Sequence, residues 1–216
     1  MSHQEAVGAV GLNDLRRGSV ERLMADYDFP QAHARQVRRL ADRMASQLVH
    51  ELVLGNDARL VLNCAALLHD IGWHFGQSKH HLRSYELIKA NGLSGFTADQ
   101  VEQIALVARY HRKARPKLKH QAFAQLNAMD RQTVTNLAAV LRVADGLDRS
   151  HRSAVQDVEV RCDERTVQLI LEPRFDDIEV ELWAAGRKKK LLEMVLGRAV
   201  LFTIGRQEPG AGSVSW

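Results

Sequence analysis

Histidine and aspartate side chains that could bind a metal ion fall on the apolar faces of predicted helices. At 100° per residue, His33 shares a helix face with Val37 and Leu40, and Asp145 shares one with Leu141. The titratable residues placed inward in this way are His33, His69, Asp70, His81, His111 and Asp145. Imidazole and carboxylate groups that converge in a helical core are typical ligands of a divalent first-row metal ion. The pattern therefore predicts a metal centre inside a bundle of helices.

Two of these residues are carboxylates, which are costly to bury without a partner. Asp70 and Asp145 therefore need a cation or strong hydrogen-bond donors. Each residue alone has a simpler explanation, because His33 could be an ordinary core histidine and Asp145 could pair with Arg142 or Arg149. Taken together, the set favours a metal site over these separate explanations.

A stretch of positive charge overlaps this set in the sequence. Between Gln103 and Met129 there are no acidic residues. The basic residues of this stretch are Arg109, Arg112, Lys113, Arg115, Lys117 and Lys119. Such a concentration indicates an anionic partner. Arg109, Arg112 and Lys113 share a predicted helix face and are candidates for binding substrate phosphate, whereas a solvated surface is the favoured explanation for the other three. Nucleic acid is a disfavoured partner, because no docking motif accompanies the charge.

The elements that must position these residues are mostly helices. Apolar periodicity predicts helices over 30–52, 59–69, 79–90, 97–112 and 130–149. The helix over 59–69 is expected to be buried all round, with Gly72 as its C-terminal cap, and Thr97 with Gln100 forms a capping box. After Ser153 the pattern changes to strands over 155–160, 167–171 and 199–204 and a helix over 176–196. We expect a mainly α fold, with a helical core followed by a small β-β-α-β subdomain.

The composition of the 216 residues is that of an ordinary globular protein, with a formal charge of +4 and 45% hydrophobic residues. Global disorder, collagen and coiled coil are excluded. We expect an N-terminal extension over 1–18, the helical domain over 19–153, the small subdomain over 154–205 and a flexible tail over 206–216.

We find no sequence pattern typical of a membrane span, a secretory signal or a set of disulfides. No apolar run reaches the roughly 18–20 residues of a membrane span, and the N-terminal residues do not resemble a secretory signal. Cys64 and Cys162 form no CxxC pair, so neither a disulfide framework nor a zinc knuckle is indicated. A reduced, cytoplasmic location without membrane association is the default expectation.

Three segments resemble a known family of proteins. They read "LLHDIGWHFGQSKHHLRSYELIKANGLSGF", "IALVARYHRKARPK" and "LAAVLRVADGLDRSH". The set H…HD…D resembles the HD superfamily of metal-dependent phosphohydrolases, which has an all-helical core. Within it, the segments look most like the C-terminal HD region of the exopolyphosphatase / guanosine pentaphosphate phosphatase (Ppx/GppA) family. The resemblance covers roughly Ser19 to Ile204.

This resemblance implies particular metal ligands. The first histidine falls on His33, the doublet on His69 and Asp70, and the last acid on Asp145. Some HD enzymes hold a second metal ion with two intermediate histidines, which would fall on His81 (alternatively His80) and on His111. One or two divalent ions are thus implied, and mixed nitrogen and oxygen ligands admit Mn, Mg, Fe, Co, Ni or Zn.

The resemblance also implies a function, namely metal-dependent hydrolysis of a phosphate ester or phosphoanhydride. The substrate would be a nucleotide, polyphosphate or a related anion, and the candidate catalytic residues are Asp70 and His111. Arg83 stands where the family commonly has a histidine, and it could hold a phosphate. In the family an actin-like N-terminal domain carries the phosphatase chemistry, and this sequence has no Gly-rich phosphate loop, so exopolyphosphatase activity does not follow from the family alone. The alternative is a non-catalytic module that binds polyphosphate or nucleotides, and a homodimer is a further expectation.

Overall fold

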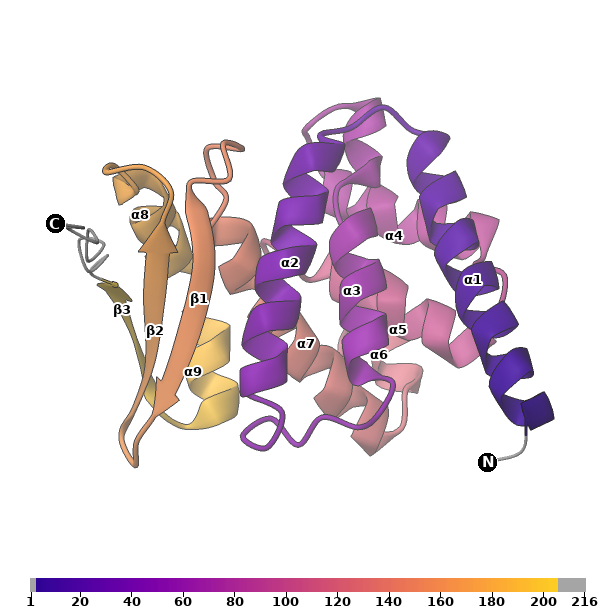
Figure 1. Ribbon diagram of the computed structural model, residues 1–216. Coiled ribbons are helices and arrows are strands. Elements are labelled where there is room, and N and C mark those ends of the chain that lie inside the picture. The colour runs from indigo at the N-terminus through magenta and orange to yellow at the C-terminus, as the bar shows by residue number, and fades with distance from the viewer. Residues whose placement is uncertain (1–2, 206–216) are drawn as a thin grey trace, which may run out of the picture.

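The computed structural model describes residues 3–205, and the side chains of residues 12–205 (Figure 1). The helical elements are α1 (His3–Ala25), α2 (Gln31–Gln47), α3 (Ala58–Leu68), the 3-10 helix η1 (Ile71–Phe75), α4 (His80–Asn91), α5 (Ala98–Arg109), α6 (Gln121–Gln125), α7 (Ala128–Gly146), α8 (Glu179–Lys188) and α9 (Lys190–Leu196). The strands are β1 (Val155–Cys162), β2 (Thr166–Pro173) and β3 (Ala199–Ile204). The predicted mainly α fold with a small β-containing subdomain is confirmed.

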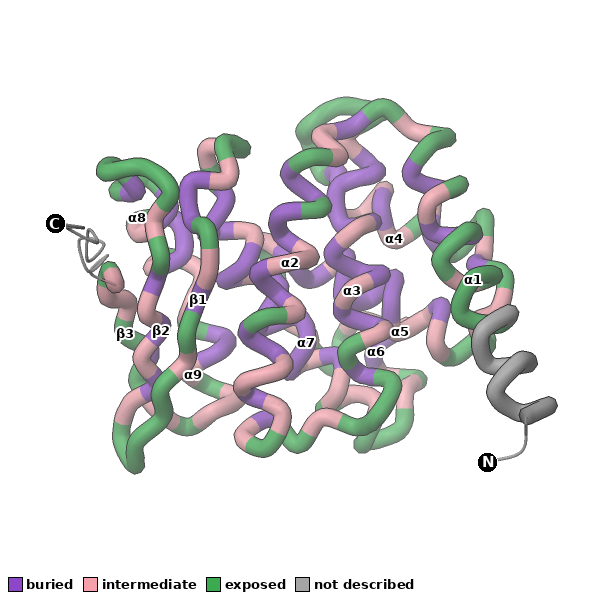
Figure 2. The backbone as a smooth tube through the Cα atoms, in the orientation of Figure 1, coloured by how far each residue is buried: buried purple, intermediate pink, exposed green. Residues whose placement is uncertain are grey.

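The hydrophobic core lies between α2, α3, α5 and α7, and the buried stretches of these helices face one another (Figure 2). Leu40, Leu62, Ile104 and Leu137 are fully buried in it. The capping box at the start of α5 is confirmed, because the backbone N–H of Gln100 donates to Oγ1 of Thr97 at 3.2 Å.

Three expectations about the helices are wrong in detail. The helix α3 is not buried all round, because Leu60, Asn63 and Leu67 on one face are only half-buried. Gly72 does not cap α3 but lies inside η1, where a Cβ atom would come within 2.3 Å of the carbonyl oxygen of His80. The predicted helix over 176–196 is divided at Lys189 into α8 and α9. Of the predicted N-terminal extension, residues 3–18 lie in helix α1, and the predicted tail over 206–216 lies outside the described residues.

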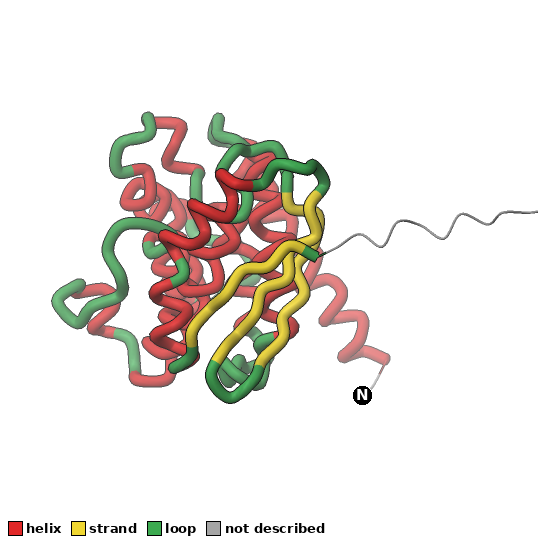
Figure 3. The backbone as a smooth tube through the Cα atoms, turned by 90° about the vertical axis from the view of Figure 1, so that its left-hand side faces the viewer, coloured by secondary structure: helices red, strands yellow, loops and turns green. Residues whose placement is uncertain are grey.

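The sheet has the order β1-β2-β3 within the described chain (Figure 3). Strands β1 and β2 are an antiparallel hairpin, whereas β2 and β3 are parallel and are connected through α8 and α9. Val167, Leu169 and Leu171 alternate along β2 as its buried face, as expected for a sheet with one face against a core. The strand β1 lies along α2, which attaches the sheet to the helical bundle (Figure 1).

A close approach of two helices places the subdomain over one end of α7. A Cβ atom added to Gly146 would lie 2.7 Å from the Cα atom of Ala185, so only glycine lets α8 cross α7 at this distance. The contact brings Lys188, at the end of α8, beside Asp145. None of the helices among the described residues has the length and apolar character required to cross a membrane.

Candidate metal centre

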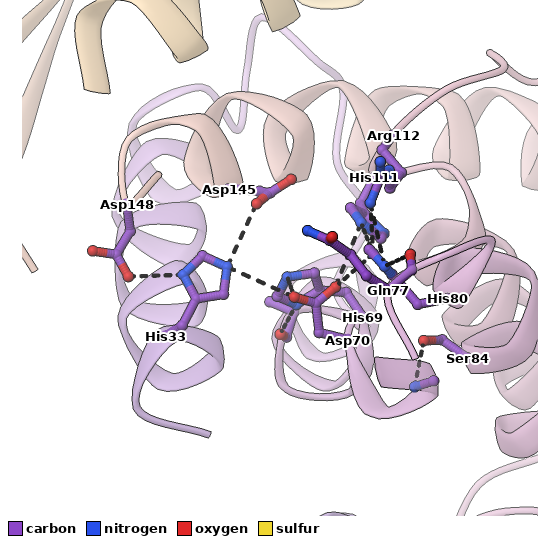
Figure 4. Close-up of polar contacts among 12 residues, drawn as sticks. His33, His69, Asp70, Gln77, His80, Ser84, His111, Arg112, Asp145 and Asp148 are labelled. Carbon is purple, nitrogen blue, oxygen red and sulfur yellow. Dashed lines mark hydrogen bonds and ion pairs between the residues drawn. The ribbon is translucent and has the colours of Figure 1, made fainter. Parts of the chain in front are cut away.

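Ends of several helices meet at a cluster of buried histidines and aspartates (Figure 4). Each position follows from the helix that carries it: His33 lies in α2, His69 and Asp70 follow α3, His80 begins α4, His111 follows α5, and Asp145 lies in the last turn of α7. The four histidines and Asp70 are all no more than 4% exposed. Residues widely separated in the sequence are thereby brought together in the interior.

Hydrogen bonds fix which ring nitrogen of each histidine carries a proton. Nδ1 of His69, His80 and His111 donates to the carbonyl oxygen three residues earlier in the chain, at 2.7, 2.9 and 2.7 Å. Nδ1 of His33 bonds to the carboxylate of Asp148 at 2.8 Å. A carbonyl or carboxylate oxygen only accepts, so each Nδ1 carries the hydrogen and each Nε2 of a neutral ring presents a lone pair. Such hydrogen bonds are those that orient metal-ligating histidines in proteins.

The Nε2 atoms converge on the two oxygens of Asp70. Oδ1 lies 3.0 Å from Nε2 of His80 and 3.6 Å from that of His111. Oδ2 lies 3.5 Å from Nε2 of His69 and 3.9 Å from that of His33. Asp70 therefore stands between two groups of potential ligands, each with its donor atoms within 4.8 Å of one another.

Several atoms of this cluster have unsatisfied electron pairs. Nε2 of His69 and Oδ1 of Asp70 are buried without a hydrogen-bond partner among the described residues. Nε2 of His80 and Nε2 of His111 lie 3.2 Å apart, although the Nδ1 assignment gives neither a proton to donate. Nitrogen ligands bound to one ion at about 2.1 Å stand roughly 3.0–3.4 Å apart at angles between a right angle and tetrahedral. The donor set thus fits a divalent metal ion.

Arg112 does not supply the missing proton. Its Nη1 lies 3.2 Å from Nδ1 and 3.3 Å from Nε2 of His80. Both nitrogens are bonded to Cε1, and a donor at nearly equal distance from them would collide with Cε1 if it lay in the ring plane, so the guanidinium lies over the ring face. The lone pair of His80 lies in the ring plane, so it stays directed at the cluster.

The electrostatics of the cluster favour neutral imidazoles beside ionised carboxylates. Burial lowers the pKa of His69 and holds the pKa of His111 well below its usual value. Burial would raise the pKa of Asp70, but the surrounding histidines, first among them His69, outweigh burial and lower that pKa. These are the protonation states that a metal ion requires of its ligands.

His33 differs, because a proton is favoured on it in the metal-free protein. Burial would lower its pKa, but hydrogen bonds to Asp145 and Asp148 outweigh burial and raise the pKa to about 9. Its Nε2 lies 3.5 Å from Oδ1 of Asp145. Asp145 also forms an ion pair with Lys188, and this charge outweighs burial to hold the pKa of Asp145 well below its usual value. A metal ion at this position would displace the proton from His33.

A cavity of about 400 Å³ opens from the cluster and is strongly cationic. The basic residues that line it are Arg112, Lys113, Arg142, Arg149, Arg187 and Lys188. Trp73, Gln77, His151, Trp183 and Ala184 also line it. The positive side chains come from the loop after α5, from the end of α7 and from α8, and they surround the space in front of the ligands.

The structure brings together five of the predicted metal ligands, namely His33, His69, Asp70, His111 and Asp145. His81 is not among them, and His80 takes the place predicted for it. Because α4 begins at His80, directly after the left-handed residue Lys79, the first side chain of the helix extends toward Asp70. The ring of His81 is centred 6.3 Å from that of His111, and its Nδ1 finds no partner within the described part of the chain.

Two of the predicted phosphate-binding arginines also lie elsewhere. Arg83 donates to the carbonyl oxygen of Phe75, outside the cavity. The guanidinium of Arg109 lies 5.3 Å from the ring centre of Tyr85 and does not line the cavity. The helix α5 ends at Arg109, so the helical spacing that grouped it with Arg112 and Lys113 does not continue, and only those two reach the cavity.

Sequence reasoning missed the contribution of α8 and part of α7 to the site. The missed residues are Arg142, Arg149, His151, Trp183, Arg187 and Lys188, of which Arg142 and Arg149 had been considered only as partners of Asp145. Arg142 does not pair with Asp145, since it donates to the carbonyl oxygens of Tyr110 and Lys113. The residue that could have indicated the position of α8 is Gly146, because it allows α8 to pack closely against α7. The importance of this glycine is apparent only once the contact between these two distant segments is known.

Comparison with known proteins identifies the family. The sequence model of "Ppx/GppA phosphatase, domain III" matches residues 15–183, which is more than half of the chain. The chain belongs to this family, as the resemblance predicted. A relative is the protein named guanosine-5'-triphosphate,3'-diphosphate pyrophosphatase of Pseudoalteromonas atlantica, which is 26% identical over 133 residues. That alignment covers 61% of this chain and 26% of the relative, so the chain matches about a quarter of the relative's length.

Proposed function

We propose that this chain is a metal-dependent phosphohydrolase of the HD type, which acts on a phosphate ester or phosphoanhydride. The observation that carries the proposal is the convergence of four imidazole Nε2 atoms on Asp70, where Nε2 of His69 and Oδ1 of Asp70 are buried without a hydrogen-bond partner among the described residues. The substrate class would be a nucleotide, polyphosphate or a related anion. Membership of the Ppx/GppA family and the name of the relative support this class.

The ligands of two ions would share one carboxylate. His33, His69, Asp70 and Asp145 would hold one ion, and Asp70 with His80 and His111 would hold the other. Mn, Mg, Fe, Co, Ni and Zn all accept such mixed nitrogen and oxygen ligands. When bound, the ions would polarise a phosphoryl oxygen and lower the pKa of a water molecule toward neutrality.

The chain's own residues would bind and orient the phosphate. Arg112 and Arg187 would each offer a planar pair of N–H donors to phosphoryl oxygens, and Lys113 a mobile point charge. The helix α8 would limit access of bulk water to the buried end of the cavity. The low pKa of buried His111 supports a role as a neutral ligand rather than as the general acid.

The direct test combines metal content with turnover. The protein, purified without chelator or nickel resin, is analysed for bound elements, then loaded with Mn²⁺, Mg²⁺, Co²⁺ or Ni²⁺. It is assayed with nucleotides, polyphosphate and bis(p-nitrophenyl) phosphate. We expect stoichiometric metal and turnover of at least one substrate that disappears on chelation. A folded protein that binds metal but turns over none of them contradicts catalysis, and one that binds no metal contradicts the whole proposal.

The alternative function is a non-catalytic module that binds polyphosphate or nucleotides. One observation favours this alternative, namely the ion pair between Lys188 and Asp145. Lys188 balances the negative charge of Asp145, a predicted metal ligand, so this carboxylate does not require a metal ion. Tight polyphosphate binding to a metal-free protein, unchanged when metal is added, would favour this module over the enzyme. The basic residues that line the cavity would bind an anionic ligand in the enzyme and in the binding module alike.

A further inference from the structure

A second cavity, also of about 400 Å³, lies between α1, α2 and α3 and shares no lining residue with the metal centre. In Figure 1, α3 is seen between α2 and α1 on the side facing the viewer. We call this cavity the α1–α3 groove. Its apolar floor is formed by Val20, Leu60, Cys64 and Leu67. The half-buried face of α3, which the core does not cover, is therefore the floor of a hollow rather than a flat surface.

The rim of the groove is basic. The charged residues that line it are Arg16, Arg17, Glu21, Arg35 and Arg38. Glu21 is fully engaged by Arg35, whose guanidinium donates to both carboxylate oxygens at 2.9 and 2.6 Å. The pair crosses from α1 to α2 at the rim. Besides Arg35, the charges of Arg17 and Arg38 also lower the pKa of Glu21, but neither of these two side chains forms an ion pair with it.

Arg38 is the rim residue with free donors. It is half-buried, yet its side chain forms no hydrogen bond or ion pair with any residue that the structure describes. On the floor below, Oδ1 of Asn63 is buried and likewise has no partner in this part of the chain. The partly exposed guanidinium of Arg38 is therefore free to pair with an anion. A buried amide oxygen is ordinarily satisfied, so Oδ1 of Asn63 indicates that a polar group with a hydrogen to donate also fits the groove.

We propose that the α1–α3 groove binds a small amphiphilic anion, with one acidic head group and a short apolar body. The head would be a carboxylate or a phosphate monoester, held by the fork of Arg38. The apolar body would cover Leu60 and Leu67 on α3. The volume is within the usual range for small-molecule sites. An inorganic anion would leave the apolar floor exposed, and a neutral lipid would leave the arginine unpaired.

The test uses anilinonaphthalene sulfonate as the reporter, because it is itself an amphiphilic anion with environment-sensitive fluorescence. The full chain is titrated with it, and octanoate, octyl phosphate, octyl glucoside and inorganic phosphate are then added as competitors. We expect octanoate or octyl phosphate to displace the reporter, and the stronger of the two reveals which head group the groove prefers. Octyl glucoside supplies only the apolar tail and inorganic phosphate supplies only the charge. Each should therefore compete at least tenfold more weakly than the better anionic amphiphile.

Variants locate the binding to the groove. Arg38→Gln should weaken binding of the reporter at least tenfold, because it removes the free guanidinium and no intramolecular contact. Arg22→Gln, which removes the same charge from an exposed position of α1 outside the groove, should leave binding unchanged. Equal affinity for the Arg38→Gln and Arg22→Gln proteins, or displacement by neither anionic amphiphile, would overturn the proposal.

Discussion

His80 and His111 face each other with stacked rings, 5.2 Å between centres and 13° between planes, and with their Nε2 atoms 3.2 Å apart. The two residues come from the start of α4 and the end of α5, helices that pack side by side. Each ring is fixed from behind by a backbone carbonyl at Nδ1. The arrangement holds two lone pairs in one place, which is favourable when a cation accepts both of them.

The first prediction separates two adjacent histidines. His80→Ala should lose one equivalent of metal, and His81→Ala should keep the full amount, because only His80 reaches Asp70. The measurement is elemental analysis of the two purified proteins beside the unmodified one. Turnover should follow the same order. Full metal content in His80→Ala with loss in His81→Ala would restore the ligand set expected from the sequence.

The second prediction concerns the residues proposed to hold the first ion. His69→Ala and Asp145→Ala should each abolish metal binding at that position and reduce turnover by at least about a hundredfold. Asp14→Asn serves as the matched control, since Asp14 is exposed and remote from the cluster, and it should retain both. Circular dichroism checks that the variants remain folded. Metal-dependent turnover that survives both substitutions would refute the assigned ligands.

The third prediction tests the crossing of α7 and α8. Gly146→Ala places a Cβ atom against the backbone of Ala185 and should destabilise the protein by about 1–3 kcal/mol. The melting temperature should fall by roughly 2–4 °C for each kcal/mol. Gly186→Ala is the control in the same helix pair, because a Cβ atom there meets nothing within 4 Å. That variant should be neutral or slightly stabilised, and equal melting temperatures for both would contradict the close contact.

The fourth prediction is a pH dependence of the metal-free protein. The pKa of His33 is raised from 6.5 to about 9 on folding, so between these values the folded state binds a proton that the unfolded state has released. The stabilisation is therefore complete below pH 6.5 and is lost as the pH rises toward 9, on the order of 3 kcal/mol in total. Urea unfolding with chelator present, at several pH values, measures it.

His33→Gln provides the control for this pH dependence. It removes the titrating group, so its free energy of unfolding should vary less over the same pH range, whatever its absolute stability. Saturating metal should also flatten the profile of the unmodified protein, because a bound ion replaces the proton. A free energy of unfolding that is constant, or that rises, between pH 6.5 and 9 would contradict the role of His33.

The helices and most of the cluster were predictable because they depend on local periodicity. The apolar stripe of α2 identified His33 as an inward residue, and the apolar character of α3 set His69 and Asp70 at its end. Each of these depends on neighbours within two helical turns. The inward placement of Asp145 on α7 follows from the same rule.

The rest of the site depends on where helices end and on which distant elements meet. Of the two alternatives His80 and His81, only His80 reaches Asp70, and α4 begins at His80, one residue after the start expected from the sequence. Grouping Arg109 with Arg112 failed because α5 stops between them. Arg187 and Lys188 join the cavity through the contact at Gly146, which no local pattern encodes. Boundaries and long-range contacts are the parts that a single sequence specifies least directly.

The crossing of α8 over Gly146 also bears on how the site is assembled during synthesis. The residues that gather around Asp70 all precede Arg187 and Lys188 in the chain, so they leave the ribosome first. A nascent chain folding from its N-terminus therefore completes the ligand cluster before the last cationic side chains are present. Until that final stretch docks, Asp145 has no lysine beside it, so a metal ion that bound at this stage would not compete with Lys188 for the carboxylate.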